Sequence, residues 1–388
     1  MMRILFVCST EYQILNALNI KLHIFPDLAA DIILQRAEYS GIADRLKELN
    51  IFENVCCGKE IIFDLHEYKL AWRETGSSPV SLGKATVNTV VKLWRKALGA
   101  VLGPKYHLKH LVNGYDNIRD KHYDKVLMQS ANAIVCNIYD DLHKDSEMAI
   151  LDEGTRSYGD NVICREGTKA DAVYLYDPEM AIYFEDKSIN YVKIPQLSAK
   201  DEAFVNIVNK VFAYVPQHNY IKNQLIFFDQ GGEQMPKYLQ NPNWLVKLLL
   251  ANSIKKHMQP YKEYISQVKA FKYIAANRTV YIKYHPRTPD GMLKEFEGEQ
   301  FKSIEPRKLP WELYALNNQI DECKLISVCS SSVSLFPMTV GGNNKCVLLH
   351  ECVDYNMGDK YKLLFEKIAQ KYKDEVFIAT NIDDVIEF

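Results

Sequence analysis

The hydrophobic positions of the N-terminal half form short apolar runs, separated by stretches in which apolar residues recur every three to four positions. Tyr12, Leu15 and Leu18 have this helical spacing and follow Ser9 and Thr10, which are suited to capping a helix. The runs that predict buried strands lie at Arg3–Cys8, Asp31–Leu34, around Val55, at Lys125–Met128 and at Met148–Leu151. This alternation predicts an α/β domain with a parallel sheet and helices on both faces.

The C-terminal half repeats the pattern after a connecting segment. Its predicted strands lie at Gln224–Asp229, Val280–Tyr284, Lys324–Val328 and Lys345–His350. We therefore expect two Rossmann-like domains that face each other across a cleft: residues 1–195, a linker at 196–220, and residues 221–388. The helix expected at Lys360–Tyr372 closes the second domain and could pack back on the first.

Composition limits the class of protein. The chain has 388 residues, 47% of them hydrophobic, so it can bury a large core. A net charge of −2 argues against general nucleic-acid binding. The nine cysteines form no disulfide or zinc pattern, and no apolar run reaches membrane-spanning length. These features predict a soluble, cytoplasmic protein with reduced thiols.

One candidate site begins at Thr279–Arg287, a β-branched and aromatic run that ends at Pro286. The predicted strand places His285 in a loop at its carboxyl end, where ligands bind in open α/β sheets. Lys283 lies two residues earlier, on the same strand face as His285, and would favour an anionic ligand. The alternative is a histidine that only caps a turn before proline.

Two further patterns lie in the same half. Ser330, Ser331 and Ser332 follow a predicted strand, where their hydroxyls and backbone N–H groups could bind an anion or merely cap a helix. Pro310-Trp311-Glu312 begins a short helix and could direct one carboxylate at sugar hydroxyls. Together these residues form a candidate phosphate and sugar site.

In the first domain, the strand at Met148–Leu151 runs directly into Asp152, Glu153 and Gly154. This places two carboxylates at the carboxyl edge of the predicted sheet, and the glycine permits a tight turn. Acidic turns are common, so this pattern alone is weak.

A basic segment interrupts the alternation. No acidic residue occurs at 75–115, and apolar residues from Val87 to Leu102 have near-helical spacing. Lys92, Arg95 and Lys96 could bind an anionic membrane surface, which would give a peripheral contact with the inner face of the membrane. The alternative is a helix that packs on the domain with a solvated basic face.

The motifs Lys283-x-His285-Pro286, Pro310-x-Glu312 and the serine triplet resemble the donor half of bacterial sialyltransferases with the GT-B architecture. Glycosyltransferase family 52, the lipooligosaccharide sialyltransferases, is the nearest in pattern. The pairing of Asp152-Glu153-Gly154 with the His-Pro motif satisfies a signature of several such families. The opening at 8–16, with Thr10 and Gln13, is also similar, although Glu11 stands where those sequences often have proline.

The resemblance implies an enzyme that transfers sialic acid from CMP-sialic acid to a glycan or glycolipid, by metal-independent inverting displacement. It implies Asp152 as the general base, with Glu153 as its neighbour or substitute, and His285 as the partner of the donor phosphate. The other residues that it implies bind the donor are Lys283, Pro286, Glu312, Ser330, Ser331, Ser332, Thr10 and Gln13. No cofactor or metal is expected, and the chain has no Asp-x-Asp motif to hold a metal.

Several alternatives remain open at this stage. They are transfer from another nucleotide sugar, a CDP-alcohol glycero- or ribitolphosphotransferase, and a non-catalytic binding protein in polysaccharide assembly. Asp229 and Glu263 are rival bases from the second domain. The acceptor, which could be a terminal galactose of lipooligosaccharide or capsule, the linkage and the oligomeric state do not follow from the sequence.

Overall fold

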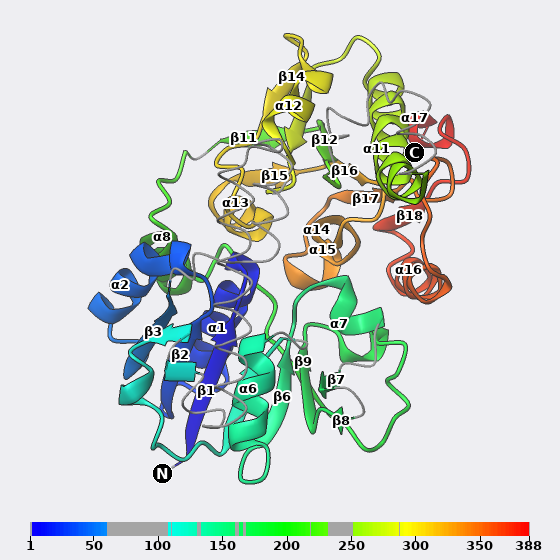
Figure 1. Cartoon of the computed structure of the whole chain (residues 1–388). Coiled ribbons are helices and arrows are strands. Elements are labelled where there is room, and N and C mark those ends of the chain that lie inside the picture. The colour runs from blue at the N-terminus through cyan, green and yellow to red at the C-terminus, as the bar shows by residue number, and fades with distance from the viewer. Residues whose placement is uncertain are drawn as a thin grey trace, which may run out of the picture.

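The structure is a computed structural model that describes residues 2–59, 108–109, 111–129, 133–159, 163–165, 168–217, 219–231, 251–286 and 288–387. Two α/β units lie one above the other in Figure 1, the N-terminal unit below and the C-terminal unit above. Of the basic segment expected at 75–115, only Leu108, Lys109 and residues 111–115 fall within the described part. The membrane-contact hypothesis therefore concerns residues outside it.

The N-terminal domain is built on a sheet of eight described strands. All of its strand pairs are parallel except β3 with β4. In order across the sheet the strands are β10 (Asn190–Lys193), β9 (Ala172–Leu175), β6 (Glu147–Leu151), β5 (Lys125–Met128), β1 (Arg3–Cys8), β2 (Ala29–Leu34), β3 (Asn54–Gly58) and β4 (Val112–Asn113). The central strands are buried on both faces, as in parallel sheets covered by helices.

Helices connect these strands. Those in the described residues are α1 (Glu11–His23), η1 (Ala37–Tyr39), α2 (Ser40–Glu48), η2 (Tyr115–Asn117), α6 (Ala133–Leu142), α7 (Thr155–Gly159) and η3 (Pro178–Met180). A small ribbon, β7 (Ile163–Arg165) with β8 (Thr168–Lys169), lies outside the main sheet. Because parallel strands need crossovers, most of these helices link neighbouring strands.

The C-terminal domain contains a six-stranded parallel sheet in the described part of the chain. Its order is β14 (Phe301–Ser303), β13 (Val280–Lys283), β12 (Leu225–Phe228), β16 (Lys324–Ser327), β17 (Lys345–Leu348) and β18 (Val376–Ile378), and β11 (Tyr220–Lys222) pairs separately with β15 (Gln319–Asp321). The helices are α11 (Ala251–Ala275), α12 (Asp290–Leu293), η4 (Lys294–Phe296), α13 (Trp311–Asn317), α14 (Ser331–Ser334), α15 (Phe336–Thr339), α16 (Asp359–Lys371) and α17 (Asp384–Glu387). Two facing Rossmann-like domains confirm the predicted α/β fold of GT-B type.

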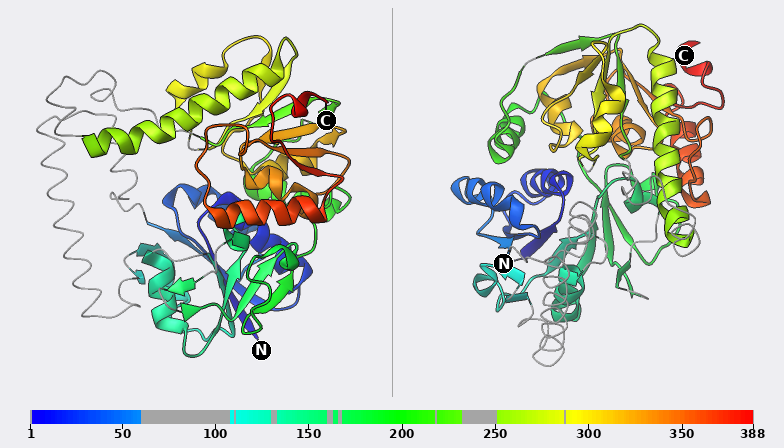
Figure 2. Two further views of the ribbon diagram at one scale, coloured as in Figure 1. Left: turned by 90° about the vertical axis from the view of Figure 1, so that its right-hand side faces the viewer. Right: turned by 45° about the horizontal axis from the view of Figure 1, so that its top comes forward.

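Among the described helices, α8 (Glu202–Phe212) and α16 contact both domains or join them. The connecting helix α8 contacts α1 and α2 on one side and α13 on the other. The C-terminal helix α16 contacts α7 and η3 of the N-terminal domain, and it runs along the domain boundary in the left view of Figure 2. There, Lys371 forms ion pairs with Asp177 and Glu179, both at 2.8 Å. The expected boundaries at 195 and 221 bracket α8, and their exact positions stay predictions.

No helix in the described segments is long and apolar enough to span a membrane.

Candidate active site at the domain boundary

The first group of the site is the carboxyl of Asp152, which follows β6 and is fully buried. Its Oδ1 accepts a hydrogen bond from the Gly154 N–H (2.7 Å), and its Oδ2 accepts one from the Tyr158 hydroxyl (3.0 Å). Burial raises the pKa of Asp152 to about 7, although both hydrogen bonds act to lower it. A carboxyl with a pKa near neutrality is suited to accept a proton at physiological pH.

A second buried carboxyl comes from the opposite domain. Glu312 lies in the first turn of α13, and burial raises its pKa to about 7 while the charge of Lys283 opposes the shift. After burial, the charge of Glu312 also raises the pKa of Asp152. Burial, and then the charges of both carboxyls, raise the pKa of the Tyr12 hydroxyl on α1. Burial is thus the main cause of the raised pKa of both carboxyls, and the charge of Glu312 adds a smaller effect on Asp152.

A hydrogen-bond network supports Asp152 from behind. The Tyr158 hydroxyl that donates to Asp152 accepts from the backbone N–H of Tyr176 (3.1 Å). The Tyr176 hydroxyl donates to Asn16 Oδ1 (2.8 Å), and Asn16 Nδ2 donates to the Asp152 carbonyl (3.1 Å). Sequence reasoning did not identify the two tyrosines, because no local pattern indicates that they converge on residue 152.

Glu153, the expected neighbour or substitute for the base, is largely buried, with a side-chain exposed fraction of 11%. Its carboxylate accepts from Gln13 Nε2 at the long distance of 3.5 Å, and it lies 3.7 Å from Arg156. The Glu153 N–H donates to Ser157 Oγ (2.9 Å). Glu153 therefore lies beside Asp152 but has different partners.

Thr10 and Gln13 begin α1 and form a capping box. The Gln13 N–H donates to Thr10 Oγ1 (3.2 Å), and Gln13 Oε1 accepts from the Thr10 N–H (3.3 Å). Gln13 Nε2 also donates to Gln129 Oε1 (2.9 Å), at the end of β5. Both residues thus lie at the carboxyl edge of the sheet, near Glu153, and their part in donor binding stays a prediction.

His285 and Pro286 follow β13 in the C-terminal domain, with His285 partly buried and Pro286 exposed. The His285 imidazole lies against the turn after β12: a β-carbon on Gly231 would be 3.2 Å from His285 Nδ1. Gly231 has φ +74°, which also favours glycine. The neighbouring strand order β13-β12-β16 brings this loop toward the serine turn, and Cys329 Sγ donates to Gln230 Oε1 at 3.2 Å.

Lys283 is buried at the end of β13, and its ammonium donates to the carbonyls of Pro306 (3.1 Å) and Arg307 (3.0 Å). Burial lowers its pKa to about 8, and the charges of Glu305 and Glu312 oppose this shift. Two of its three N–H donors thus order the loop before α13. The predicted contact with a nucleotide is not tested by these bonds.

The serine turn follows β16, with Ser330 as the N-cap of α14 and all three serines partly buried. The Ser330 N–H donates to Ser327 Oγ (3.0 Å). Ser331 lies against the acidic turn of the other domain, because a β-carbon on Gly154 would be 2.9 Å from Ser331 Oγ. The turns after β6 and β16 are therefore in direct contact.

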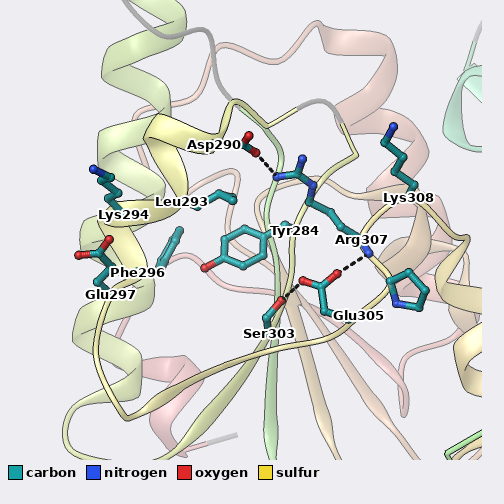
Figure 3. Close-up of a pocket in the computed structure, with 11 residues that line it drawn as sticks. Tyr284, Asp290, Leu293, Lys294, Phe296, Glu297, Ser303, Glu305, Arg307 and Lys308 are labelled. Atoms are coloured by element: carbon teal, nitrogen blue, oxygen red, sulfur yellow. Dashed lines mark hydrogen bonds and ion pairs between the residues drawn. The ribbon is translucent and has the colours of Figure 1, made fainter.

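A cavity of about 730 Å³ lies beside the loop that Lys283 orders. In Figure 3, Tyr284 and Phe296 form an apolar wall. Arg307 extends across the cavity and forms an ion pair with Asp290 (3.1 Å), while its backbone N–H donates to Glu305 (2.8 Å). The cavity is thus adjacent to the candidate donor residues.

Among the described residues, no group of three or more His, Cys, Asp or Glu side chains is arranged to hold a metal ion. The rival acids differ in their positions. Asp229 is buried beside the His285 loop, whereas Glu263 lies on α11 and accepts from Gln259 Nε2 (2.9 Å) and the Asn356 N–H (3.3 Å).

Comparison with known proteins does not assign the chain to a family. No family model matches it, and no curated protein matches it. Among solved structures, it is similar to Arabidopsis thaliana UGT89C1 complexed with UDP, with a TM-score of 0.47 and 11% identity over 100% of this chain and 89% of that chain. UGT89C1 complexed with UDP-L-rhamnose gives a TM-score of 0.40 and 10% identity over 99% and 92%. At TM-scores below 0.5, this likeness carries no conclusion about donor or reaction.

Proposed function

We propose that this protein is a sialyltransferase that moves sialic acid from CMP-sialic acid to a hydroxyl group of a glycan. The observation that carries the proposal is the contact between Gly154 and Ser331, which joins the acidic turn of one domain to the serine turn of the other. The sequence motifs on either side of this contact resemble those of bacterial sialyltransferases. Transfer from a nucleotide-activated sugar needs a base for the acceptor hydroxyl on one side and groups that bind the donor phosphate on the other.

In the proposed reaction, Asp152 accepts the proton of the acceptor hydroxyl. The acceptor oxygen then forms a bond to the anomeric carbon of sialic acid as the bond from that carbon to the phosphate oxygen breaks, and CMP leaves with the electron pair. Support comes from the burial of Asp152 and its pKa of about 7, since such a carboxyl is half deprotonated at neutrality and becomes a stronger base than an exposed one. Inversion at the anomeric carbon follows from the resemblance alone.

On the donor side, His285 donates to or stabilises the departing phosphate, with help from the hydroxyls and N–H groups of Ser330, Ser331 and Ser332. Hydrogen-bond donors in a partly buried site act strongly on a developing negative charge. CMP carries one phosphate, so these groups can serve without a metal. Transfer is therefore expected to persist in excess EDTA.

The remaining donor contacts follow from the resemblance. Glu312 would bind the ribose hydroxyls from the first turn of α13. Lys283 would contact the nucleotide, and its bonds to the carbonyls of Pro306 and Arg307 would keep the adjacent loop in place. The acceptor that we propose is a terminal galactose of lipooligosaccharide or capsule.

A panel of activated donors tests the proposal. The purified chain is incubated with CMP-sialic acid, UDP-sugars and CDP-glycerol, and release of the nucleotide is measured with and without candidate glycans. We expect turnover of CMP-sialic acid only, and a loss of roughly a hundredfold in His285→Ala. Turnover of a UDP-sugar or CDP-glycerol in place of CMP-sialic acid would overturn the assignment.

A further inference from the structure

The buried carboxylate of Asp229, at the end of β12, joins two loops of the C-terminal domain. Its Oδ1 accepts from the Gly231 N–H (3.0 Å) and from Gln267 Nε2 (2.9 Å). Its Oδ2 accepts from the Thr288 hydroxyl and, at the long distance of 3.4 Å, from the backbone N–H of His285. One carboxylate is thus bonded both to the turn after β12 and to the loop that carries His285.

We infer that Asp229 is a positioning residue, which holds the loop of His285 against the glycine turn after β12. The inference rests on the proposed function, because the position of His285 matters for turnover only if His285 serves the donor. The carboxylate acts through His285 and does not itself contact the donor.

The geometry on either side of His285 supports this assignment. The imidazole lies so close to Gly231 that a β-carbon there would be 3.2 Å from Nδ1. A second hydrogen bond fixes the turn after β12, because the Gln230 N–H donates to Gln267 Oε1 (3.0 Å). Displacement of either loop would therefore move the imidazole relative to the serine turn.

The same bonds argue against Asp229 as the general base. A carboxylate has about four acceptor positions, and four donors within the domain occupy those of Asp229. An acceptor hydroxyl would have to displace one of them. In Asp229→Asn, the side-chain NH₂ group would face N–H or O–H donors that now bond to the carboxylate. Those buried donors would then lack a hydrogen-bond acceptor.

Hydrogen exchange tests the positioning without any donor. In Asp229→Asn, we expect the His285 amide proton to exchange at least tenfold faster than in the wild type, beyond any change shared by the whole domain. Asp31→Asn is the control for loss of a buried, hydrogen-bonded carboxylate, because Asp31 lies in the N-terminal sheet, where it also pairs with Arg3 and Lys121. If Asp229→Asn does not fold, Thr288→Val is measured in its place. It removes only the hydrogen bond from the Thr288 hydroxyl to Asp229 Oδ2, the oxygen that also accepts from the His285 N–H, so the same faster exchange at His285 is expected. Unchanged exchange at His285 in the folded variant would overturn the inference, whatever the donor.

A double-mutant cycle then separates positioning from general destabilisation. We expect Asp229→Asn to lower turnover of CMP-sialic acid about tenfold in the wild type, but less than twofold in the His285→Ala background. Equal losses in both backgrounds would overturn the inference. If His285 exchange changes as expected but CMP-sialic acid is not a substrate, the proposed function fails while the structural role of Asp229 stands.

Discussion

Gly154 of the N-terminal domain lies directly against Ser331 of the C-terminal domain. A β-carbon on Gly154 would be 2.9 Å from Ser331 Oγ and 3.0 Å from its Cβ, and the backbone of Gly154 has φ +100°. The positive φ favours glycine, and a β-carbon would force Ser331 to shift. This contact fixes the distance between the acid of one domain and the serine turn of the other.

We predict that Gly154→Ala separates the two turns. The left-handed φ alone costs about 1–3 kcal/mol for a residue with a side chain, and the methyl group would collide with Ser331. Transfer should fall at least tenfold, with a lower melting temperature. Gly358→Ala is the matched control, since Gly358 has φ −67° and no atom within 4 Å of the added carbon. Equal rates in the two variants would show that the contact does not matter.

Replacement of Asp152 by Asn should abolish its function as a base while donor binding survives. The amide keeps the shape but cannot accept the proton, so we expect transfer to fall roughly a hundred- to ten-thousandfold. Initial rates and CMP affinity are compared with those of Glu153→Gln, Asp229→Asn and Glu263→Gln. Near wild-type transfer by the Asp152 variant would remove Asp152 from the mechanism. The base would then be Glu153 or Glu263 if its variant lost transfer, or Asp229 only if the loss in Asp229→Asn far exceeded the tenfold expected from positioning.

The pH dependence of transfer should reveal the effect of the Tyr158 hydrogen bond on the pKa of Asp152. Burial raises the pKa of Asp152 to about 7, and the Tyr158 hydroxyl acts in the opposite direction. Loss of that hydroxyl in Tyr158→Phe should raise the pKa further. Because transfer needs the deprotonated carboxyl, activity should rise through pH 7 in the wild type and at a higher pH in the variant.

The control for this profile is Tyr115→Phe, which removes a buried hydroxyl bonded to another carboxylate, that of Asp141 (3.2 Å). In Tyr115→Phe, the rise of activity with pH on the acidic side of the profile should match that of the wild type. A rise that does not move in Tyr158→Phe, or that moves equally in both variants, would contradict the role assigned to Tyr158.

The ion pairs of Lys371 with Asp177 and Glu179 should hold α16 on the N-terminal domain. Lys371→Met should lower the melting temperature by about 1–3 °C, since partly exposed pairs contribute little. It should also widen the range of distances between the two domains, which small-angle X-ray scattering would detect. The nearby exposed Lys373 provides the control variant Lys373→Met, which should leave both measurements unchanged. An identical scattering profile for Lys371→Met would remove this pair from domain closure.

The sequence was sufficient to predict those parts of the fold with strong local patterns. Lys125–Met128 is a strand at the predicted residues, and its apolar residues 126–128 are buried in the parallel sheet. Asn190–Lys193 was not identified as a strand, since its two apolar residues lie between polar ones and are only partly buried. Ala172–Leu175 was also missed, although it is an apolar run that is buried throughout. Their pairing depends on a register that only the folded sheet provides.

The candidate site shows the same division. Asp152 and Ser331 were predicted from motifs at strand ends, and the topology brings their turns into contact. The bond from Tyr158 to Asp152 joins residues six apart, and the bond from Thr288 to Asp229 joins residues 59 apart. Such partners are chosen by tertiary packing, so no periodicity or motif indicated them.

Titration calorimetry of the wild-type chain with CMP, UDP and CDP-glycerol tests the central claim most directly. The claim is that the serine turn and the His285 loop bind the single phosphate of a CMP-activated donor. We predict that CMP binds, that UDP and CDP-glycerol bind much more weakly, and that Ser331→Ala weakens CMP binding modestly. Failure of CMP to bind, with strong binding of UDP or CDP-glycerol, would contradict the account.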